Sequence, residues 1–333
     1  MEKTKVILDC DTGSDDAVAI MLAILSDKLE LLGVSTVAGN KEINFTTDNT
    51  LRVIELLGSK APVYRGCHTS MVTKIAPGRR GGYNGMTGVS EFNVDAKGNI
   101  IQYHNDCLPI AEAKTKEKKE HAVFWLIDTL MRSEGDIVLV PTGPLTNIAM
   151  ALRLEPAIAG KIKELVFMGG GFKVFNSTSC AEFNIWADPE AAQIVLTSGI
   201  EKITMVPLDA THSANFSRED AKELRDYGTE LCRVVADLID ERVTAYDAYQ
   251  PQNPLGTAPL HDALALAYVF DREVLRDVKL MRVDVDCGGG FADGSTLCDT
   301  RAYPDRELNC YVALDADRER FVKLTKELLK SFK

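Results

Sequence analysis

The chain has 333 residues, of which 45% are hydrophobic and 26% are charged, and its formal net charge is -11 at pH 7. This composition predicts a soluble globular protein with a large core, and the acidic balance disfavours nucleic acid or an anionic membrane as a partner. No apolar stretch approaches the roughly 18 residues of a membrane span, and no signal peptide precedes the first predicted strand, so we expect a cytoplasmic protein.

The sequence also argues against a division into several domains and against structural zinc sites or disulfides. It contains no Pro-rich or Ser-rich linker, low-complexity run or internal repeat, so we expect a single domain over residues 1–333. Its eight cysteines are scattered without a Cys-x-x-Cys pair, which disfavours a zinc site or a disulfide framework. Cys10 lies among carboxylates that oppose thiolate formation, so we interpret it as a packing residue.

The first predicted unit is a strand at residues 6–8, a turn at 12–14 and a helix at 17–25. Two carboxylates follow the strand and two lie in the first helical turn, where the helix dipole favours negative charge. Unpaired carboxylates held together are costly, and their hard oxygens suit calcium or magnesium. The unit therefore predicts a cation site made from Asp9, Asp11, Asp15 and Asp16.

Other known loops fit this stretch less well. An EF-hand beginning at Asp9 needs an acid at its twelfth position, which is Ile20, and no Gly-rich nucleotide loop ending in Lys-Ser or Lys-Thr is present. The start Asp9-Cys-Asp11-Thr is similar to that of haloacid-dehalogenase-like phosphatases. A phosphatase therefore remains an alternative at this point.

Strands and helices alternate along the rest of the chain. This alternation predicts an α/β fold with an open, mostly parallel central sheet flanked by helices on both faces. The expected strands lie at 31–37, 62–65, 136–140, 163–167, 203–206, 279–286 and 308–313. The expected helices lie at 43–57, 121–131, 145–154, from 188, through most of 217–249, at 263–270 and from 317 to the end.

Residues 68–107 interrupt the pattern with a long irregular segment, which favours a lid or a binding loop. We expect His104 and the Lys-rich run 114–119 to lie at the surface. Elsewhere, polar or turn residues follow the carboxyl ends of predicted strands, where ligands bind in open α/β sheets. Asp11, Asn40, Thr142 and Met168 occupy such positions, so four loops are expected to converge on one site.

The strongest motifs together resemble one family. They are Asp9-x-Asp11-x-Gly13-x-Asp15-Asp16, Pro141-Thr-Gly-Pro-Leu-Thr-Asn-Ile-Ala149, Met168-Gly-Gly-Gly171, Ala181-Glu-Phe-Asn184 and His261-Asp262. In this order, over most of the chain, they are similar to the motifs of the inosine-uridine-preferring nucleoside hydrolases. The resemblance implies a nucleoside hydrolase-like fold and calcium-dependent hydrolysis of the N-glycosidic bond of ribonucleosides, with a nucleoside as the small-molecule partner.

The resemblance also implies roles for individual residues. Calcium (Ca2+) would be held by the carboxylates of Asp11, Asp16 and Asp262 and by the backbone carbonyl of Thr142. Asp11 would take a proton from a calcium-bound water as the ribosyl centre becomes positive, and His261 would lie near the leaving base. The substrate-binding residues would be Asp15 at the ribose 2′-hydroxyl, with Asn40, Met168, Asn176, Glu182, Asn184 and His261.

The chain departs from the family pattern at residues 78–88. Many members have a His-Gly pair there, whereas this chain reads Arg80-Gly-Gly-Tyr-Asn-Gly. Leaving-group activation is therefore open, with Tyr83, Tyr246 or Tyr249 as candidate substitutes. The segment 89–120 also exceeds the expected length, which favours a reshaped pocket mouth or altered oligomer contacts.

Two other functions stay open on sequence alone. One is a magnesium-dependent phosphohydrolase with Asp9 as its nucleophile, although no later Lys and acidic pair match convincingly. The other is a non-catalytic protein that binds a nucleoside or sugar. A homo-oligomer, either a dimer or a tetramer, is the expected assembly, and base preference is not predicted.

Overall fold

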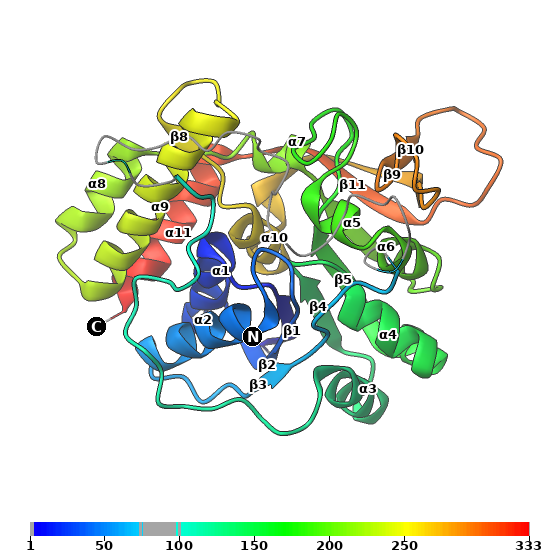
Figure 1. Cartoon of the computed structure of the whole chain (residues 1–333), viewed down its shortest axis with the longest axis horizontal. Helices are drawn as coiled ribbons and strands as arrows, with labels where there is room; N and C mark the ends of the chain where they lie inside the picture. Colours follow the sequence, from blue (N-terminus) through cyan, green and yellow to red (C-terminus); the bar gives the residue numbers. More distant parts are fainter. Residues whose placement is uncertain (1–2, 73–74, 76–97, 99–100, 333) are drawn as a thin grey trace.

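The computed structural model describes residues 3–72, 75, 98 and 101–332. The predictions made for residues 78–88, including the role of Tyr83, fall outside these residues. In the described part of the chain, nine strands form one sheet that runs through the middle of the molecule (Figure 1). In order across the sheet, the strands are β10 (Thr296–Asp299), β9 (Leu275–Val285), β11 (Cys310–Ala316), β6 (Ile203–Val206), β5 (Ile162–Met168), β4 (Ile137–Pro141), β1 (Thr4–Cys10), β2 (Leu29–Thr36) and β3 (Val63–Arg65).

The sheet is mostly parallel, as the sequence predicted. Neighbouring strands are parallel from β3 through β11, whereas β9 is antiparallel to both β11 and β10. A second pair, β7 (Phe216–Ser217) with β8 (Thr257–Ala258), is antiparallel and lies outside this sheet. The overall architecture is therefore an open α/β fold with an antiparallel extension at one edge.

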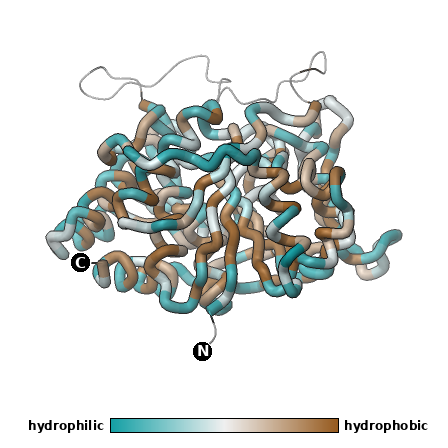
Figure 2. The backbone as a smooth tube through the Cα atoms, turned by 90° about the horizontal axis from the view of Figure 1, so that it is seen from below, coloured by the Kyte–Doolittle hydropathy of each residue, from teal (hydrophilic) through white to brown (hydrophobic). Residues whose placement is uncertain are grey.

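Helices cover both faces because the strands are apolar on both sides. Along β1, Val6 and Leu8 pack into one core cluster and Ile7 into the other, as alternating side chains of a strand require. Figure 2 shows the hydrophobic stretches running through the middle of the molecule. The first cluster is covered by α1 (Ser14–Leu25), α2 (Ile43–Leu56), α8 (Arg218–Asp226), α9 (Glu230–Tyr249), α10 (His261–Phe270) and α11 (Arg318–Ser331), and the second by α3 (Ala122–Arg132), α4 (Thr146–Leu154) and α6 (Pro189–Leu196).

The short elements were not predicted. They are β7, β8, β10, the α-helices α5 (Phe183–Ala187) and α7 (Leu208–Thr211), and the 3-10 helices η1 (Pro156–Lys161) and η2 (Arg272–Val274). Elements of two to six residues show too little periodicity to be recognised. The helical region 217–249 is also two helices, because Gly228 adopts a φ of 78° after α8 and ends it.

Two loops at the carboxyl ends of the strands lie where the order of the strands in the sheet changes direction. Strand β1 pairs with β2 on one side and with β4 on the other, so the loops after β1 and β4 open at a topological switch point. The backbone N–H of Thr142 donates to the carbonyl of Asp9 at 2.8 Å and joins these two loops. The fold therefore brings the acidic stretch and the Pro141-Thr-Gly turn together.

Two further features of the described residues concern the helices and the cysteines. None of the described helices is both long and apolar enough to cross a bilayer. All eight cysteines are free thiols, and Cys10 is buried in the core. Burial raises the pKa of the Cys10 thiol well above its usual value, which disfavours a thiolate there.

Candidate active site

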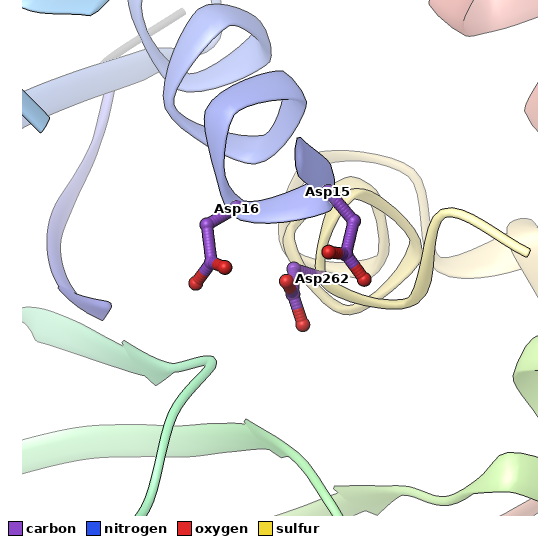
Figure 3. Close-up of side chains that lie close together, drawn as sticks. All are labelled: Asp15, Asp16 and Asp262. Atoms are coloured by element: carbon purple, nitrogen blue, oxygen red, sulfur yellow. The ribbon is translucent and has the colours of Figure 1, made fainter. Parts of the chain in front are cut away.

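Three buried carboxylates meet where two helices begin. Asp15 and Asp16 lie in the first turn of α1 and Asp262 lies in the first turn of α10, and Figure 3 shows the three side chains directed into the same space. Each offers one oxygen within 4.8 Å of the others. In the part of the chain that the structure describes, this is the group of acidic side chains able to hold a metal ion.

Asp11 and Thr142 adjoin this group. The backbone N–H of Asn40 donates to Oδ2 of Asp11 at 2.6 Å, whereas the buried Oδ1 of Asp11 has no hydrogen-bond partner among the described residues. The hydroxyl of Thr142 donates to Oδ1 of Asp16 at 2.7 Å. The structure thus brings together Asp11, Asp16, Thr142 and Asp262, the residues that the family resemblance implied as ligands, with Asp15 in the same acidic cluster.

The crowding of buried carboxylates in this cluster favours a bound cation. Burial, reinforced by the charge of Asp16, raises the pKa of Asp11 well above its usual value, and burial with the neighbouring acids does the same for Asp262. The pKa of Asp16 rises to about 6 because it is buried and faces Asp15. Crowded buried carboxylates and an unpartnered oxygen are well matched to a divalent cation with hard oxygen ligands.

One protein cation already faces the cluster. The guanidinium of Arg242, in α9, is buried and forms an ion pair with Asp15, its Nη1 lying 2.9 Å from Oδ1. Nη1 also donates to Oγ of Ser14 at 3.0 Å, and Nε donates to the carbonyl of Pro259 at 2.9 Å. Arg242 therefore ties the start of α1 to the segment that leads into α10.

Asp11 fits its place only because two neighbours are glycines. A Cβ on Gly39 would lie 2.1 Å from Oδ2 of Asp11, and a Cβ on Gly143 would lie 2.9 Å from Oδ1. We expect Gly39→Ala to displace the Asp11 carboxylate and to weaken divalent-metal affinity by at least about tenfold. Isothermal titration checks this, with Gly160→Ala as the control because its Cβ would meet open space. Unchanged affinity in Gly39→Ala would argue against Asp11 as a ligand.

A cavity of about 300 Å³ opens beside the acidic cluster. Nine of the eleven predicted metal-binding and substrate-binding residues line it, whereas Asp11 and Asp16 lie behind it, hydrogen-bonded to Asn40 and Thr142. These nine predicted residues are Asp15, Asn40, Thr142, Met168, Asn176, Glu182, Asn184, His261 and Asp262. The sequence-based site is therefore one continuous surface in three dimensions.

Glu182 and Asn184 form the polar wall of this cavity. Glu182 caps α5, accepting from the backbone N–H groups of Asn184 and Gly170, and burial raises its pKa to about 7. The Asn184 amide donates to the carbonyls of Thr142 at 2.8 Å and Met168 at 3.2 Å. The side-chain carbonyl of Asn176 accepts from the backbone N–H of Phe183, which fixes that residue in the same wall.

His261 lies on the opposite, more aromatic wall. Its Nε2 is 2.5 Å from the hydroxyl of Tyr246, and its Nδ1 is 2.7 Å from Oγ1 of Thr211. Burial, together with the charge of Arg242, lowers the pKa of His261 well below its usual value. The imidazole is therefore neutral near pH 7, and both of its ring nitrogens already have partners.

Sequence reasoning missed two residues at this wall. His104 was expected at the surface, but it lines the cavity and packs against Gly13, where an added Cβ would lie 2.1 Å from its Nδ1. No local sequence pattern predicts this position of His104, because the residue lies in a segment without regular secondary structure. Arg242 did carry a signal, because it interrupts the apolar face of α9 formed by Leu238, Ile239, Val243 and Tyr246.

These observations agree with a comparison with known proteins. Residues 6–323 match the family model described as inosine-uridine preferring nucleoside hydrolase. The chain belongs to that family. It is therefore a hydrolase of the N-glycosidic bond of ribonucleosides, with an acidic site that can hold a metal ion.

Individual relatives match nearly end to end. The pyrimidine-specific ribonucleoside hydrolase RihB of Escherichia coli (strain SE11) is 36% identical, over 100% of this chain and 99% of the relative. Among solved structures, a purine-preferring ribonucleoside hydrolase from Gardnerella vaginalis superposes with a TM-score of 0.84 at 31% identity, covering 98% of each chain. An inosine-guanosine nucleoside hydrolase superposes with a TM-score of 0.82 at 26% identity, also covering 98% of each chain.

The phosphohydrolase alternative is wrong, because the chain belongs to the nucleoside hydrolases and because Asp9 cannot act as a nucleophile where it lies. Apart from the family assignment, Asp9 is buried and does not line the cavity. Its Oδ1 accepts from Oγ of Ser35 at 2.6 Å and from Nδ2 of Asn147 at 2.7 Å, and burial raises its pKa to about 6. Asp9 therefore fixes the loops around the site and cannot reach a substrate as a nucleophile.

Proposed function

We propose that this hydrolase cleaves ribonucleosides to free base and ribose with Asp11 as general base and calcium as its cofactor. The observation that carries the proposal is the buried acidic cluster beside a cavity at the switch point of the sheet. Asp11, Asp16, Asp262 and the Thr142 carbonyl would hold the ion. Calcium suits these ligands better than magnesium because it accepts a larger and less regular oxygen shell.

The residues around the cavity have distinct tasks in this proposal. Asp15 would accept a hydrogen bond from the ribose 2′-hydroxyl, and Asn40, Met168, Asn176, Glu182 and Asn184 would enclose the sugar. Orientation of the sugar in this way lowers the entropic cost of reaction. The closely spaced carboxylates would stabilise positive charge that develops on the ribosyl ring as the glycosidic bond breaks.

The attack would depend on Asp11. Its unpartnered Oδ1 can accept a proton from the attacking water, while Oδ2 stays fixed by the Asn40 N–H. When bound, a divalent cation supplies Lewis acidity that makes a coordinated water more acidic. The bond electrons go to the nitrogen of the base, and the water oxygen bonds to the anomeric carbon.

Pyrimidine ribonucleosides are the proposed preferred substrates, because the Escherichia coli relative at 36% identity is pyrimidine-specific. A reducing-sugar assay with uridine, cytidine, inosine and adenosine in phosphate-free buffer tests this. We expect ribose release, fastest from uridine or cytidine, loss of activity after chelation, and recovery with calcium rather than magnesium. Ribose release that survives complete metal removal would contradict the metal role, and faster release from inosine would contradict the base preference.

We also propose that the protein acts as one domain in the cytoplasm and as a homo-oligomer. Eight free cysteines suit a reducing compartment. On the outer strands, Leu280 in β9 and Leu297 in β10 are 43% and 50% exposed, and a subunit contact at this edge would remove their side chains from water. Light scattering after size exclusion should report a dimer or tetramer, and a monomer at micromolar concentration would contradict this.

A further inference from the structure

The aromatic wall of the cavity leaves few groups free to stabilise a leaving base. Both ring nitrogens of His261 are engaged, by Tyr246 and by Thr211. The hydroxyl of Tyr249 donates to the carbonyl of Ile101 at 2.8 Å. Hydrolysis nevertheless leaves electrons on the nitrogen of the base, and a fixed donor in a buried site is the most effective way to stabilise such charge.

His104 is placed to be that donor. The backbone N–H of Ser14 donates to Nδ1 of His104 at 3.3 Å, so the neutral imidazole carries its proton on Nε2. The hydrogen bond of the His104 side chain to another described residue is made through Nδ1 and not Nε2, and the side chain lines the cavity. We propose that Nε2–H of His104 donates a hydrogen bond to the leaving base, a role that rests on the proposed function.

The segment that carries His104 is held by two residues, Lys41 and Asn49. Nζ of Lys41 donates to Oε1 of Gln102 at 3.1 Å and to Oδ1 of Asp106 at 2.8 Å. The amide of Asn49 donates to the carbonyls of Thr12 at 3.1 Å and Asp106 at 3.2 Å, which joins this segment to the loop after β1. These contacts fix the donor before substrate binds, as electrostatic stabilisation of a transition state requires.

Gly13 leaves room for the imidazole of His104 because it has no side chain. The imidazole lies on Gly13, at the N-terminal end of α1, where any side chain would collide with it. This position is next to Asp15, the proposed partner of the ribose 2′-hydroxyl. A donor here can therefore reach an acceptor atom of the base close to the glycosidic nitrogen. The base departs with the bond electrons and later takes its proton from solvent, so His104 itself transfers no proton.

Two substitutions of His104 separate its hydrogen bond to the leaving base from its hydrogen bond to Ser14. The side-chain amide nitrogen of glutamine can reach the place of Nε2, whereas asparagine offers Oδ1 at the place of Nδ1 and keeps the bond to Ser14. We expect His104→Asn to lower kcat for uridine by at least about a hundredfold, and His104→Gln to retain much of the activity. The exposed residue His68 provides the matched control, and His68→Asn should behave as the wild type.

A second substrate makes the test specific for the leaving group. The 4-nitrophenolate of 4-nitrophenyl β-ribofuranoside is stable without a hydrogen-bond donor, so His104→Asn should cleave this riboside at a nearly normal rate. Equal losses on uridine and the riboside, or full activity of His104→Asn on uridine, would overturn the role of His104 alone. If the wild type cleaved neither the nucleosides nor the riboside, the proposed function would fail and this inference with it.

Discussion

Asp11→Asn is expected to fold, to lose at least about a hundredfold in kcat on its best nucleoside, and to become more heat-stable without metal. The amide keeps the shape of the carboxylate and can still accept from the Asn40 N–H through its oxygen. It can no longer take a proton from water or bring a charge to the ion. Because burial and Asp16 raise the pKa of Asp11, removing its charge relieves repulsion in the metal-free protein.

Three measurements test this prediction together. Steady-state kinetics give the loss in kcat, metal analysis gives the ion content, and thermal unfolding in chelator gives the change in Tm. The matched control is Asp136→Asn, the same substitution at the opposite end of the strands, where Asp136 pairs with Lys5. Near-normal turnover of Asp11→Asn would reject its role as general base, whatever its effect on stability.

The core of the site could be predicted because its residues follow strand ends. Asp11, Asn40 and Thr142 come after β1, β2 and β4, Met168 is the last residue of β5, and parallel strands present these ends at one edge of the sheet. Short apolar runs bounded by turn residues are enough to find such buried strands in a single sequence. The position of the cavity therefore followed from local patterns and one topological rule.

The aromatic wall of the cavity could not be predicted in the same way. His104 reaches the cavity from an irregular segment, and its placement depends on tertiary contacts such as those of Lys41 and Asn49. Arg242 comes from α9, more than two hundred residues from Asp15, so its pairing follows from helix packing rather than from a motif. An Arg within an apolar helical face predicts a buried partner but does not say which acid it meets.

Arg242→Met should destabilise the metal-free protein by about 3–5 kcal/mol, because it leaves the buried carboxylate of Asp15 without its guanidinium partner. Methionine retains much of the apolar stem, so the change chiefly removes the charge and the donors to Ser14 and Pro259. Bound calcium should reduce this loss of stability, because a cation in the acidic cluster would compensate the negative charge of the same carboxylates. Denaturant unfolding with and without calcium measures both effects.

A double substitution decides whether the cost comes from the ion pair. If the uncompensated charge dominates, Arg242→Met with Asp15→Asn should recover most of the stability lost in Arg242→Met, although activity stays low. Arg225→Met is the control, because Arg225 pairs with Asp237 and Asp240 at the surface, where an ion pair contributes at most about 1 kcal/mol. If the double variant were as unstable as Arg242→Met, the hydrogen bonds to Ser14 and Pro259 would account for the loss. Arg242 would then serve to join α1 to the segment before α10. The negative charge of the acidic cluster would be compensated by the bound ion alone.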